Sequence, residues 1–290
     1  MPNMIEPARQ YIRVLTIAGS DSGGGAGIQA DLKTFAALGC YGMSAITALT
    51  AQNTQGVTAI HGVPPDMLAA QIDAVLSDIG AQAVKIGMLH APDIVHTVAA
   101  AIERHHMIQV VLDPVMVSAT GARLIEAEAV QALVTALFPR ASLITPNLDE
   151  AALLLGRPVQ AVADMAPAAQ ALLALGARAV LLKGGHLKGE QVHDLLLVRG
   201  AEPLHMCSAR LATRNLHGAG CTLSSATAAY LALGLGLSDA VQAARQYVQQ
   251  ALAAGATVQT GQGVGPLNHG FAPRTMVTLG RDQITPKDVT

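Results

Sequence analysis

The sequence contains no tryptophan, and aromatic residues make up only 2% of its 290 residues. Charged residues are also scarce, at 13%, and 18 Lys and Arg stand against 20 Asp and Glu. The formal net charge of -2 provides no basic surface for nucleic acid or anionic lipid. We therefore expect a small molecule as the partner, and neither a nucleic acid nor a membrane.

Cysteines are few, and their positions exclude two uses of this residue. Cys40, Cys207 and Cys221 form neither an even set nor a Cys-x-x-Cys pair. A disulfide framework and a cysteine zinc site are therefore not expected, which fits a reducing compartment. Residues 1–10 have mixed charge and lack the apolar core of a signal peptide. We expect a cytoplasmic protein.

The sequence also lacks a long apolar run, although 51% of its residues are hydrophobic. Residues 34–65 and 215–238 carry no Asp, Glu, Lys or Arg, but Gly, Ser, Thr, Asn or Gln interrupts each of them every few residues. A membrane-spanning helix needs about 20 predominantly apolar residues. The two stretches instead predict buried elements of an α/β core.

Short runs rich in Val, Ile and Leu alternate with longer amphipathic runs rich in Ala and Leu. This alternation predicts parallel strands joined by helices. The predicted strands lie at 11–17, 43–50, 83–86, 110–113, 143–145 and 179–182, and the predicted helices at 26–38, 65–77, 92–105, 126–137, 148–155, 163–175, 221–233 and 238–257. Two alternating runs, 192–199 and 204–210, predict an antiparallel hairpin at the sheet edge. We expect one domain over residues 1–290, with loosely held tails at 1–10 and 274–290.

A glycine-dense turn at residues 18–27 follows the first predicted strand and precedes a helix. Gly25, Gly27 and Ala30 have the G-x-G-x-x-A spacing of a dinucleotide site. The acid that should follow about 20 residues later is missing, because residues 50–53 read Thr-Ala-Gln-Asn. No G-x-x-x-x-G-K-[ST] motif occurs either. An NAD(P)-linked oxidoreductase remains an alternative, and a simple tight turn is another.

A second glycine segment, His-Gly-Ala-Gly-Cys-Thr at 217–222, precedes a long uncharged stretch. Free amides at a helix start, together with the helix dipole, form a site for an anion such as a transferring phosphoryl group. We predict this anion hole at Gly218, Ala219, Gly220 and Cys221. The dipole is expected to lower the pKa of the Cys221 thiol, so that it can accept a proton. The alternative is a small buried residue that packs a helix start.

Polar residues also follow three later predicted strands. Asn147 and Glu150 share one helical face and could hold a hydrated Mg²⁺, although the same pair is typical of a helix cap. Asp113 could assist the metal, and Lys183 could neutralise phosphate. Considered alone, Asp113 and Lys183 could each be an ordinary loop residue.

These segments occur in the order and spacing of one known family. The matching segments are 23–35, 45–54, 85–89, 112–116, 145–150, 183–186 and 217–221. Over residues 13–266 the chain resembles the hydroxymethylpyrimidine/phosphomethylpyrimidine kinases of thiamine biosynthesis. The resemblance implies a ribokinase-like three-layer α/β/α sandwich with a mostly parallel central sheet. It also implies ATP and Mg²⁺ as cofactors and, by analogy with such kinases, a homodimer.

The resemblance further implies a role for individual residues. Those implied to line the pyrimidine pocket are Gly19, Ala26, Asp31, Gln52, Met88, Val115 and Cys221, and those implied for ATP and Mg²⁺ are Asp113, Asn147, Glu150, Lys183 and Thr213. The amide of Gln52 offers a donor and an acceptor side by side, which suits an aminopyrimidine. Cys221 stands where many ribokinase-like kinases have an aspartate base. Ala219 departs from the Gly-Thr-Gly-Cys that is usual in the family, so one hydroxyl is missing.

The implied reaction is transfer of the γ-phosphate of ATP to the hydroxymethyl oxygen of the pyrimidine, followed by phosphorylation of the monophosphate. Pyridoxal is the nearest alternative acceptor, because related kinases share the glycine turn. A ligand-binding protein without catalysis is a third possibility, since a cysteine base is unusual.

Overall fold

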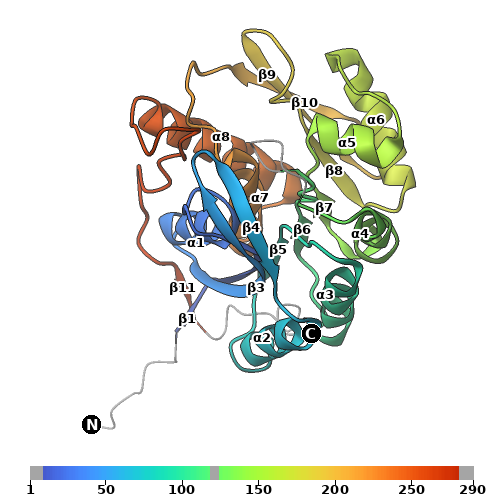
Figure 1. The fold of residues 1–290 in the computed structure, drawn as a ribbon, viewed down its shortest axis with the longest axis vertical. Helices are drawn as coiled ribbons and strands as arrows, with labels where there is room; N and C mark the ends of the chain where they lie inside the picture. Colours follow the sequence, from blue (N-terminus) through green and yellow to red (C-terminus); the bar gives the residue numbers. More distant parts are fainter. Residues whose placement is uncertain (1–8, 118–123, 281–290) are drawn as a thin grey trace.

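The structure is a computed structural model that describes residues 9–117 and 124–280. Its centre is a nine-stranded sheet with the strand order β10-β9-β8-β7-β6-β5-β2-β3-β4 (Figure 1). The strands are β2 (Arg13–Asp21), β3 (Tyr41–Asn53), β4 (Gly56–Gly62), β5 (Ala83–Ile86), β6 (Val110–Leu112), β7 (Leu143–Ile144), β8 (Ala179–Lys183), β9 (Gln191–Val198) and β10 (Leu204–Ala209). Six of them, β2, β3 and β5 to β8, run parallel, and antiparallel strands close both edges.

Helices cover both faces of the sheet. The first face carries α1 (Gly27–Ala37), α7 (Ala219–Ala232) and α8 (Leu237–Gly255), and the second carries α2 (Pro65–Asp78), α3 (Pro92–Arg104), α4 (Ala127–Ala132), α5 (Leu148–Leu155) and α6 (Val162–Ala174). Successive strand residues point to opposite faces, so Val14 packs with the first set of helices and Leu15 with the second. The result is the three-layer sandwich that the resemblance implies.

All eight predicted helices are present, and the strand and hairpin predictions are confirmed with ends that differ by a few residues. The structure adds β4, which the sequence analysis missed. This strand reads Gly-Val-Thr-Ala-Ile-His-Gly, and much of it is exposed. It therefore lacks the apolar alternation that identifies a strand packed on a core.

The predicted C-terminal tail is wrong in its starting point. Residues 278 and 279 form β11 (Thr278–Leu279), which pairs with β1 (Gln10–Tyr11). The amide of Arg274 donates to the carbonyl oxygen of Ala37 at 2.9 Å. Residues 274–280 are thus fixed by backbone hydrogen bonds with distant residues, a pairing that local composition does not reveal. Residues 1–8 and 281–290 lie outside the described part.

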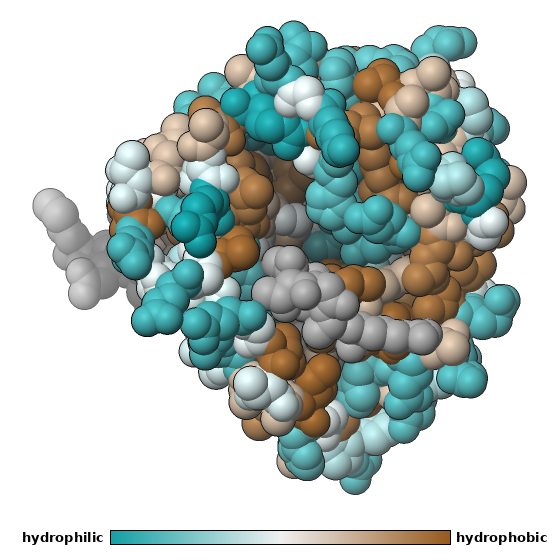
Figure 2. Space-filling model, turned by 45° about the horizontal axis from the view of Figure 1, so that its top comes forward, coloured by the Kyte–Doolittle hydropathy of each residue, from teal (hydrophilic) through white to brown (hydrophobic). Residues whose placement is uncertain are grey.

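The parallel strands end at one edge of the sheet, and the polar segments of the sequence follow them there. At this edge the molecule is hollowed, as Figure 2 shows. Within residues 9–117 and 124–280, no helix is long and apolar enough to cross a membrane.

Candidate active site

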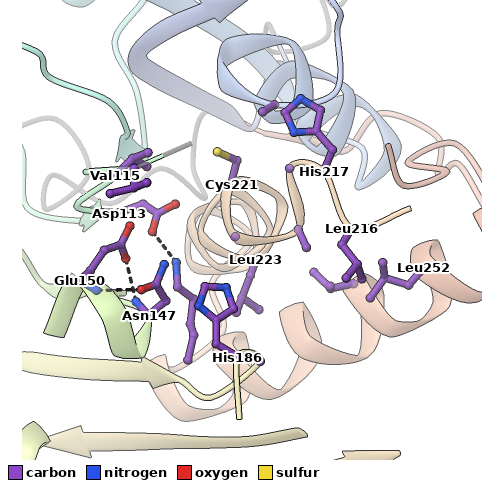
Figure 3. Close-up of a pocket in the computed structure, with 18 of the residues that line it drawn as sticks. Asp113, Val115, Asn147, Glu150, His186, Leu216, His217, Cys221, Leu223 and Leu252 are labelled. Carbon is purple, nitrogen blue, oxygen red and sulfur yellow. Dashed lines mark hydrogen bonds and ion pairs between the residues drawn. The ribbon is translucent and has the colours of Figure 1, made fainter. Parts of the chain in front are cut away.

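A cavity of about 1030 Å³ lies at the carboxyl ends of the parallel strands, the usual place for a ligand in an open α/β sheet. The predicted site residues that line it are Gly19, Ala26, Gln52, Met88, Asp113, Val115, Asn147, Glu150, Lys183, Thr213, Gly218, Ala219, Gly220 and Cys221. Figure 3 shows Cys221 between Asp113 on one side and His217 on the other. The tertiary structure therefore brings together residues from seven separated segments.

One end of the cavity is narrow and is formed by the glycine turn, the end of β3 and Met88. A β-carbon on Gly19 would lie 3.1 Å from Cε of Met88, so this end leaves little room beside the turn. Gln52 contributes a carboxamide whose oxygen lies 3.0 Å from Oγ1 of Thr50. A small flat ring with polar edges fits this arrangement.

The other end of the cavity is bordered by α8, α7 and the β9–β10 hairpin, and leucines line it together with polar side chains such as Arg210 and Arg245. Leu216, Leu223 and Leu252 line it, as does His186 (Figure 3). His186 Nδ1 lies 2.6 Å from a carboxylate oxygen of Asp149 at the mouth. Thr213 also lines the cavity, but its hydroxyl donates to the carbonyl oxygen of Ala256 at 3.1 Å.

The start of α7 provides the predicted anion hole, with one change. Gly218 caps the helix with φ 83°, in the left-handed region that glycine favours. In the described part of the chain, the amides of Gly218, Gly220 and Cys221 have no backbone or side-chain acceptor. The amide of Ala219 instead donates to the carbonyl oxygen of Leu216 at 3.1 Å, so three of the four predicted amides are free.

Lys183 supplies a cation next to these amides. Its ammonium donates to Oδ1 of Asp113 at 2.7 Å and lies 3.2 Å from where a β-carbon on Gly220 would stand. Burial opposes this charge, but Asp113 and Glu150 together raise the pKa of Lys183 above its ordinary value. A permanently charged ammonium beside free amides suits a negatively charged group.

Asp113 is almost fully buried and remains ionised. Burial works against its charge, yet Lys183 and Lys85 lower the pKa of this carboxyl below its ordinary value. Thr145 donates a further hydrogen bond to it at 3.0 Å, and Ser224 at 3.3 Å. The carboxylate of Asp113 is therefore a fixed anion between the ammonium groups of Lys183 and Lys85.

Asn147 and Glu150 form the helix cap that the sequence analysis held as the alternative. The amide of Asn147 donates to Oε2 of Glu150 at 2.7 Å, and the amide of Glu150 donates to Oδ1 of Asn147 at 2.8 Å. Burial raises the pKa of Glu150 to about 7, and the charge of Asp113 adds to the effect while Lys183 opposes it. Glu150 could cap the helix and also face a hydrated Mg²⁺, because a carboxylate can accept more than one interaction.

The described residues contain no group of three or more His, Cys, Asp and Glu that could hold a metal ion by themselves. Mg²⁺ does not need such a group, because it keeps several waters and binds through one or two carboxylates together with substrate phosphates. Asp113 and Glu150 repel each other, and a divalent cation near them would relieve that repulsion. The donor set therefore fits Mg²⁺ supplied with a nucleotide.

The expected low pKa of Cys221 is wrong. This residue is half-buried, and loss of surrounding water raises the pKa of its thiol to about 11. Lys85 and a hydrogen bond with the amide of Gly27 act in the opposite direction but do not compensate. In the free protein Cys221 is a neutral thiol at pH 7.

Asp31 is the one predicted pocket residue that does not line the cavity. Its side chain is fully buried and forms an ion pair with Lys85, whose Nζ lies 2.9 Å from Oδ2. Hydroxyls of Thr16 and Ser225 donate to the same carboxylate. Asp31 therefore holds Lys85, which does line the cavity.

Sequence reasoning gave no role to Lys85, Asp21 or the side chain of His217, although all three line the cavity. Each lies within or beside a segment that was singled out. A lysine in the middle of an apolar strand was the available signal for Lys85, because an unpaired buried cation is unfavourable and implies a partner. His217 and Asp21 are 196 residues apart, and no local pattern links them.

Comparison with known proteins assigns the family. The model of the family described as phosphomethylpyrimidine kinase matches residues 21–268. The chain belongs to the phosphomethylpyrimidine kinase family. A hydroxymethylpyrimidine/phosphomethylpyrimidine kinase of Rhizobium meliloti is 51% identical over 256 residues, which covers 88% of this chain and 96% of the relative. As a member of this family the chain is a small-molecule kinase, and the dinucleotide alternative loses its support.

Solved structures agree with this family assignment. A phosphomethylpyrimidine kinase from Clostridium difficile is 44% identical, with a TM-score of 0.73, and the match covers 83% of this chain and 99% of that one. The ADP complex of Bacillus subtilis pyridoxal kinase is 39% identical, with a TM-score of 0.83, over 90% of this chain and 98% of that one. The matching folds thus include a pyridoxal kinase as well as a phosphomethylpyrimidine kinase.

Proposed function

We propose that this protein transfers the γ-phosphate of ATP to the hydroxymethyl oxygen of 4-amino-5-hydroxymethyl-2-methylpyrimidine, and then to the resulting monophosphate, in thiamine biosynthesis. The observation that carries the proposal is the position of three free amides and Lys183 in one cavity, between the end formed by the glycine turn and the end lined by Leu216, Leu223 and Leu252. The end at the glycine turn suits the pyrimidine, and the leucines of the other end suit a nucleotide base. The ADP and AMP-PCP complexes of related kinases support a nucleotide in this fold.

In the first reaction the alcohol oxygen forms a bond to the γ-phosphorus, and the bond from that phosphorus to the β,γ-bridging oxygen breaks. ADP leaves with the electron pair of that bond. The amides of Gly218, Gly220 and Cys221 and the ammonium of Lys183 stabilise the charge on the transferring group. Positioning of the two substrates supplies much of the remaining acceleration.

The proton of the alcohol passes to the sulfur of Cys221. Because the thiol is neutral in the free protein, Cys221 must first release its own proton to solvent water in the cavity, and Lys85 favours the resulting thiolate. In the second reaction the acceptor is a phosphate oxygen, which is already ionised and needs no base. Cys221 is therefore expected to matter most in the first step.

Mg²⁺ bound with ATP would be held through Glu150 and Asp113 and would neutralise charge on the phosphates. We further propose that Asn147 orients this carboxylate pair through the cap of α5, and that Gln52, Met88, Val115, Gly19 and Ala26 contact the pyrimidine. A cytoplasmic location and a homodimer complete the proposal.

Product analysis with ATP, Mg²⁺ and hydroxymethylpyrimidine tests the proposal. Monophosphate and then diphosphate are expected. The competing acceptor is pyridoxal, because structures of pyridoxal kinases superimpose on this chain with TM-scores of 0.82 and 0.83. Comparing kcat/KM for the two acceptors decides between them, and a strong preference for pyridoxal would overturn the pyrimidine assignment.

A further inference from the structure

A chain of polar contacts crosses the narrow end of the cavity. Nε2 of His217 lies 2.8 Å from Oδ2 of Asp21 and 3.4 Å from Nε2 of Gln52. The carboxamide oxygen of Gln52 lies 3.0 Å from Oγ1 of Thr50, which in turn lies 2.9 Å from the carbonyl oxygen of Ser20. All five residues line the cavity.

His217 and Asp21 are held firmly in place. The carboxylate of Asp21 accepts the amides of Gly23, Gly25 and Ala26 at 2.8, 3.0 and 2.9 Å. A β-carbon on Gly25 would overlap the ring of His217, so the ring is packed directly on the glycine turn. Asp21 is only 3% exposed and His217 only 8%. Packing thus holds the ring of His217, and three backbone amides hold the carboxylate of Asp21.

The hydrogen on Nε2 of His217 restricts the orientation of the Gln52 carboxamide. Burial opposes the charge of Asp21, but hydrogen bonds from His217, Ala26 and Gly23 lower the pKa of this carboxyl, so it is an acceptor only. Nε2 of His217 must therefore carry the hydrogen that it donates to Asp21. An amide nitrogen of Gln52 facing the same N–H would place two donors against each other. An amide oxygen there avoids this clash and can share the hydrogen that Nε2 donates to Asp21, as the longer arm of a bifurcated hydrogen bond.

The single hydroxyl hydrogen of Thr50 also favours the orientation in which the Gln52 amide oxygen faces His217. Its hydroxyl has one hydrogen, and the carbonyl oxygen of Ser20 at 2.9 Å can only accept it. Thr50 can then only accept from Gln52. The contact at 3.0 Å is satisfied when the amide nitrogen of Gln52 faces Thr50. Both ends of this series of contacts therefore favour the same orientation of the Gln52 carboxamide.

We propose that Asp21 and His217 are positioning residues for acceptor specificity. With the oxygen and nitrogen of the Gln52 carboxamide exchanged relative to the positions given above, they hold its oxygen toward His217 and its nitrogen toward Thr50. This inference rests on the proposed function in one respect, namely that Gln52 contacts the acceptor ring. The carboxamide then presents one remaining acceptor and one remaining donor in a fixed order. A ring that offers a donor amine beside an acceptor nitrogen can pair with the amide oxygen and the amide nitrogen of Gln52 in one arrangement only.

The discriminating substrate is the analogue in which the exocyclic amine is replaced by oxygen, because it offers an acceptor beside a ring N–H in the reverse order. A fixed carboxamide rejects this analogue, and a carboxamide that is free to turn accepts both rings. The measured quantity is the ratio of kcat/KM for the amino and oxo substrates, with the full-length chain and Mg·ATP.

In the wild type this ratio is expected to be about a hundredfold or more, because a mismatched buried polar pair is strongly rejected. His217→Leu removes the donor and should reduce the ratio by about tenfold or more. His217→Gln keeps a donor near the position of Nε2 and should retain most of the discrimination. His96→Leu, at an exposed position on α3, is the control for the same substitution. An unchanged ratio in His217→Leu would overturn the proposal.

Thr50 provides a second test if His217→Leu does not fold. Thr50→Val removes the hydroxyl and should lower the ratio, whereas Thr50→Ser keeps the hydroxyl and should preserve it. Equal ratios in these two variants would also contradict the proposal.

A measurement on the free protein separates this inference from the proposed function. Nitrogen NMR of labelled His217, assigned with the help of His217→Gln, should show the hydrogen on Nε2. The Nδ1–H form would disprove the proposed orientation whichever substrate the enzyme uses. Conversely, absence of pyrimidine turnover together with the Nε2–H form would overturn the proposed function and leave the orientation of Gln52 standing.

Discussion

Gly218 and Gly25 meet backbone to backbone where the two glycine segments cross. A β-carbon on Gly218 would overlap the carbonyl oxygen of Gly25, and Gly218 has φ 83°. The turn that borders the acceptor end is thereby packed directly against the amides that are proposed to bind the phosphoryl group. The distance between the two substrates depends on this contact.

Gly218→Ala should therefore impair catalysis and stability together. The left-handed backbone alone costs a non-glycine residue about 1–2 kcal/mol, and the overlap forces the two segments apart. We expect kcat to fall by about a hundredfold or more, because small displacements of reacting groups are costly. Gly234→Ala is the matched control, since Gly234 has φ 93° but no atom near its missing β-carbon. Steady-state kinetics and thermal unfolding of both variants check the expectation.

Lys85→Met should destabilise the fold strongly, because it leaves the fully buried carboxylate of Asp31 without its cation. Breaking a buried ion pair from one side costs about 3–5 kcal/mol. Adding Asp31→Asn should recover part of this loss. Arg104→Met provides the contrast, because the pair of Arg104 with Asp73 is exposed and is worth about 1 kcal/mol or less. Denaturant unfolding measures the free energy of unfolding of the wild type and of these three variants. A loss that is no greater in Lys85→Met than in Arg104→Met would contradict the buried ion pair of Lys85 and Asp31.

Cys221→Ala should lower turnover of the alcohol by about 10²–10⁴-fold, the usual contribution of a positioned base, and should leave pyrimidine binding intact. Cys207→Ala, at an exposed position, is the control. Calorimetric binding and product formation measure the two effects separately. Unchanged turnover in Cys221→Ala would exclude Cys221 as the base.

The raised pKa of Cys221 predicts a pH dependence for its reactivity. Since the pKa of this thiol is about 11, the thiolate fraction is small at pH 7 and rises with pH. Alkylation of Cys221 by iodoacetamide should accelerate about tenfold for each pH unit between about pH 7 and 9. A rate that is already maximal at pH 7 would mean that the helix dipole outweighs burial.

Glu150 should make stability depend on pH in the opposite sense from most carboxylates. Burial raises its pKa from 4.5 to about 7 in the folded protein. The folded state therefore retains a proton that the unfolded state has lost, and the free energy of unfolding falls as pH rises from 4.5 to 7. At a pH above about 7, the free energy of unfolding is lower by roughly 3 kcal/mol than at a pH below 4.5.

The matched experiment compares unfolding of wild type and Glu150→Gln at pH 5 and 8, without metal or nucleotide. The neutral amide cannot ionise, so the variant should gain stability relative to wild type at the higher pH. Glu128→Gln, at an exposed position on α4, serves as the control. A stability difference between wild type and Glu150→Gln that stays constant with pH would contradict the raised pKa.

Local sequence features were sufficient for much of the site. Asn147 and Glu150 lie three residues apart, and the cap that this spacing predicts is present. The glycines around Cys221 predicted a helix start with free amides, and three of the four are free. At this helix start the bond from Ala219 to Leu216 escaped prediction, because it depends on how the preceding loop turns.

The sequence by itself determined the succession of strands and helices and the segments that follow the strand ends, because periodicity, caps and glycine turns depend on residues close together in the chain. Tertiary structure alone decided which charges meet and how much water surrounds them. It paired Asp31 with Lys85, brought His217 to Asp21 from 196 residues away, joined β1 to β11 and raised the pKa of Cys221. Ion pairing and desolvation depend on distances in space, and neighbouring residues in a sequence do not specify them.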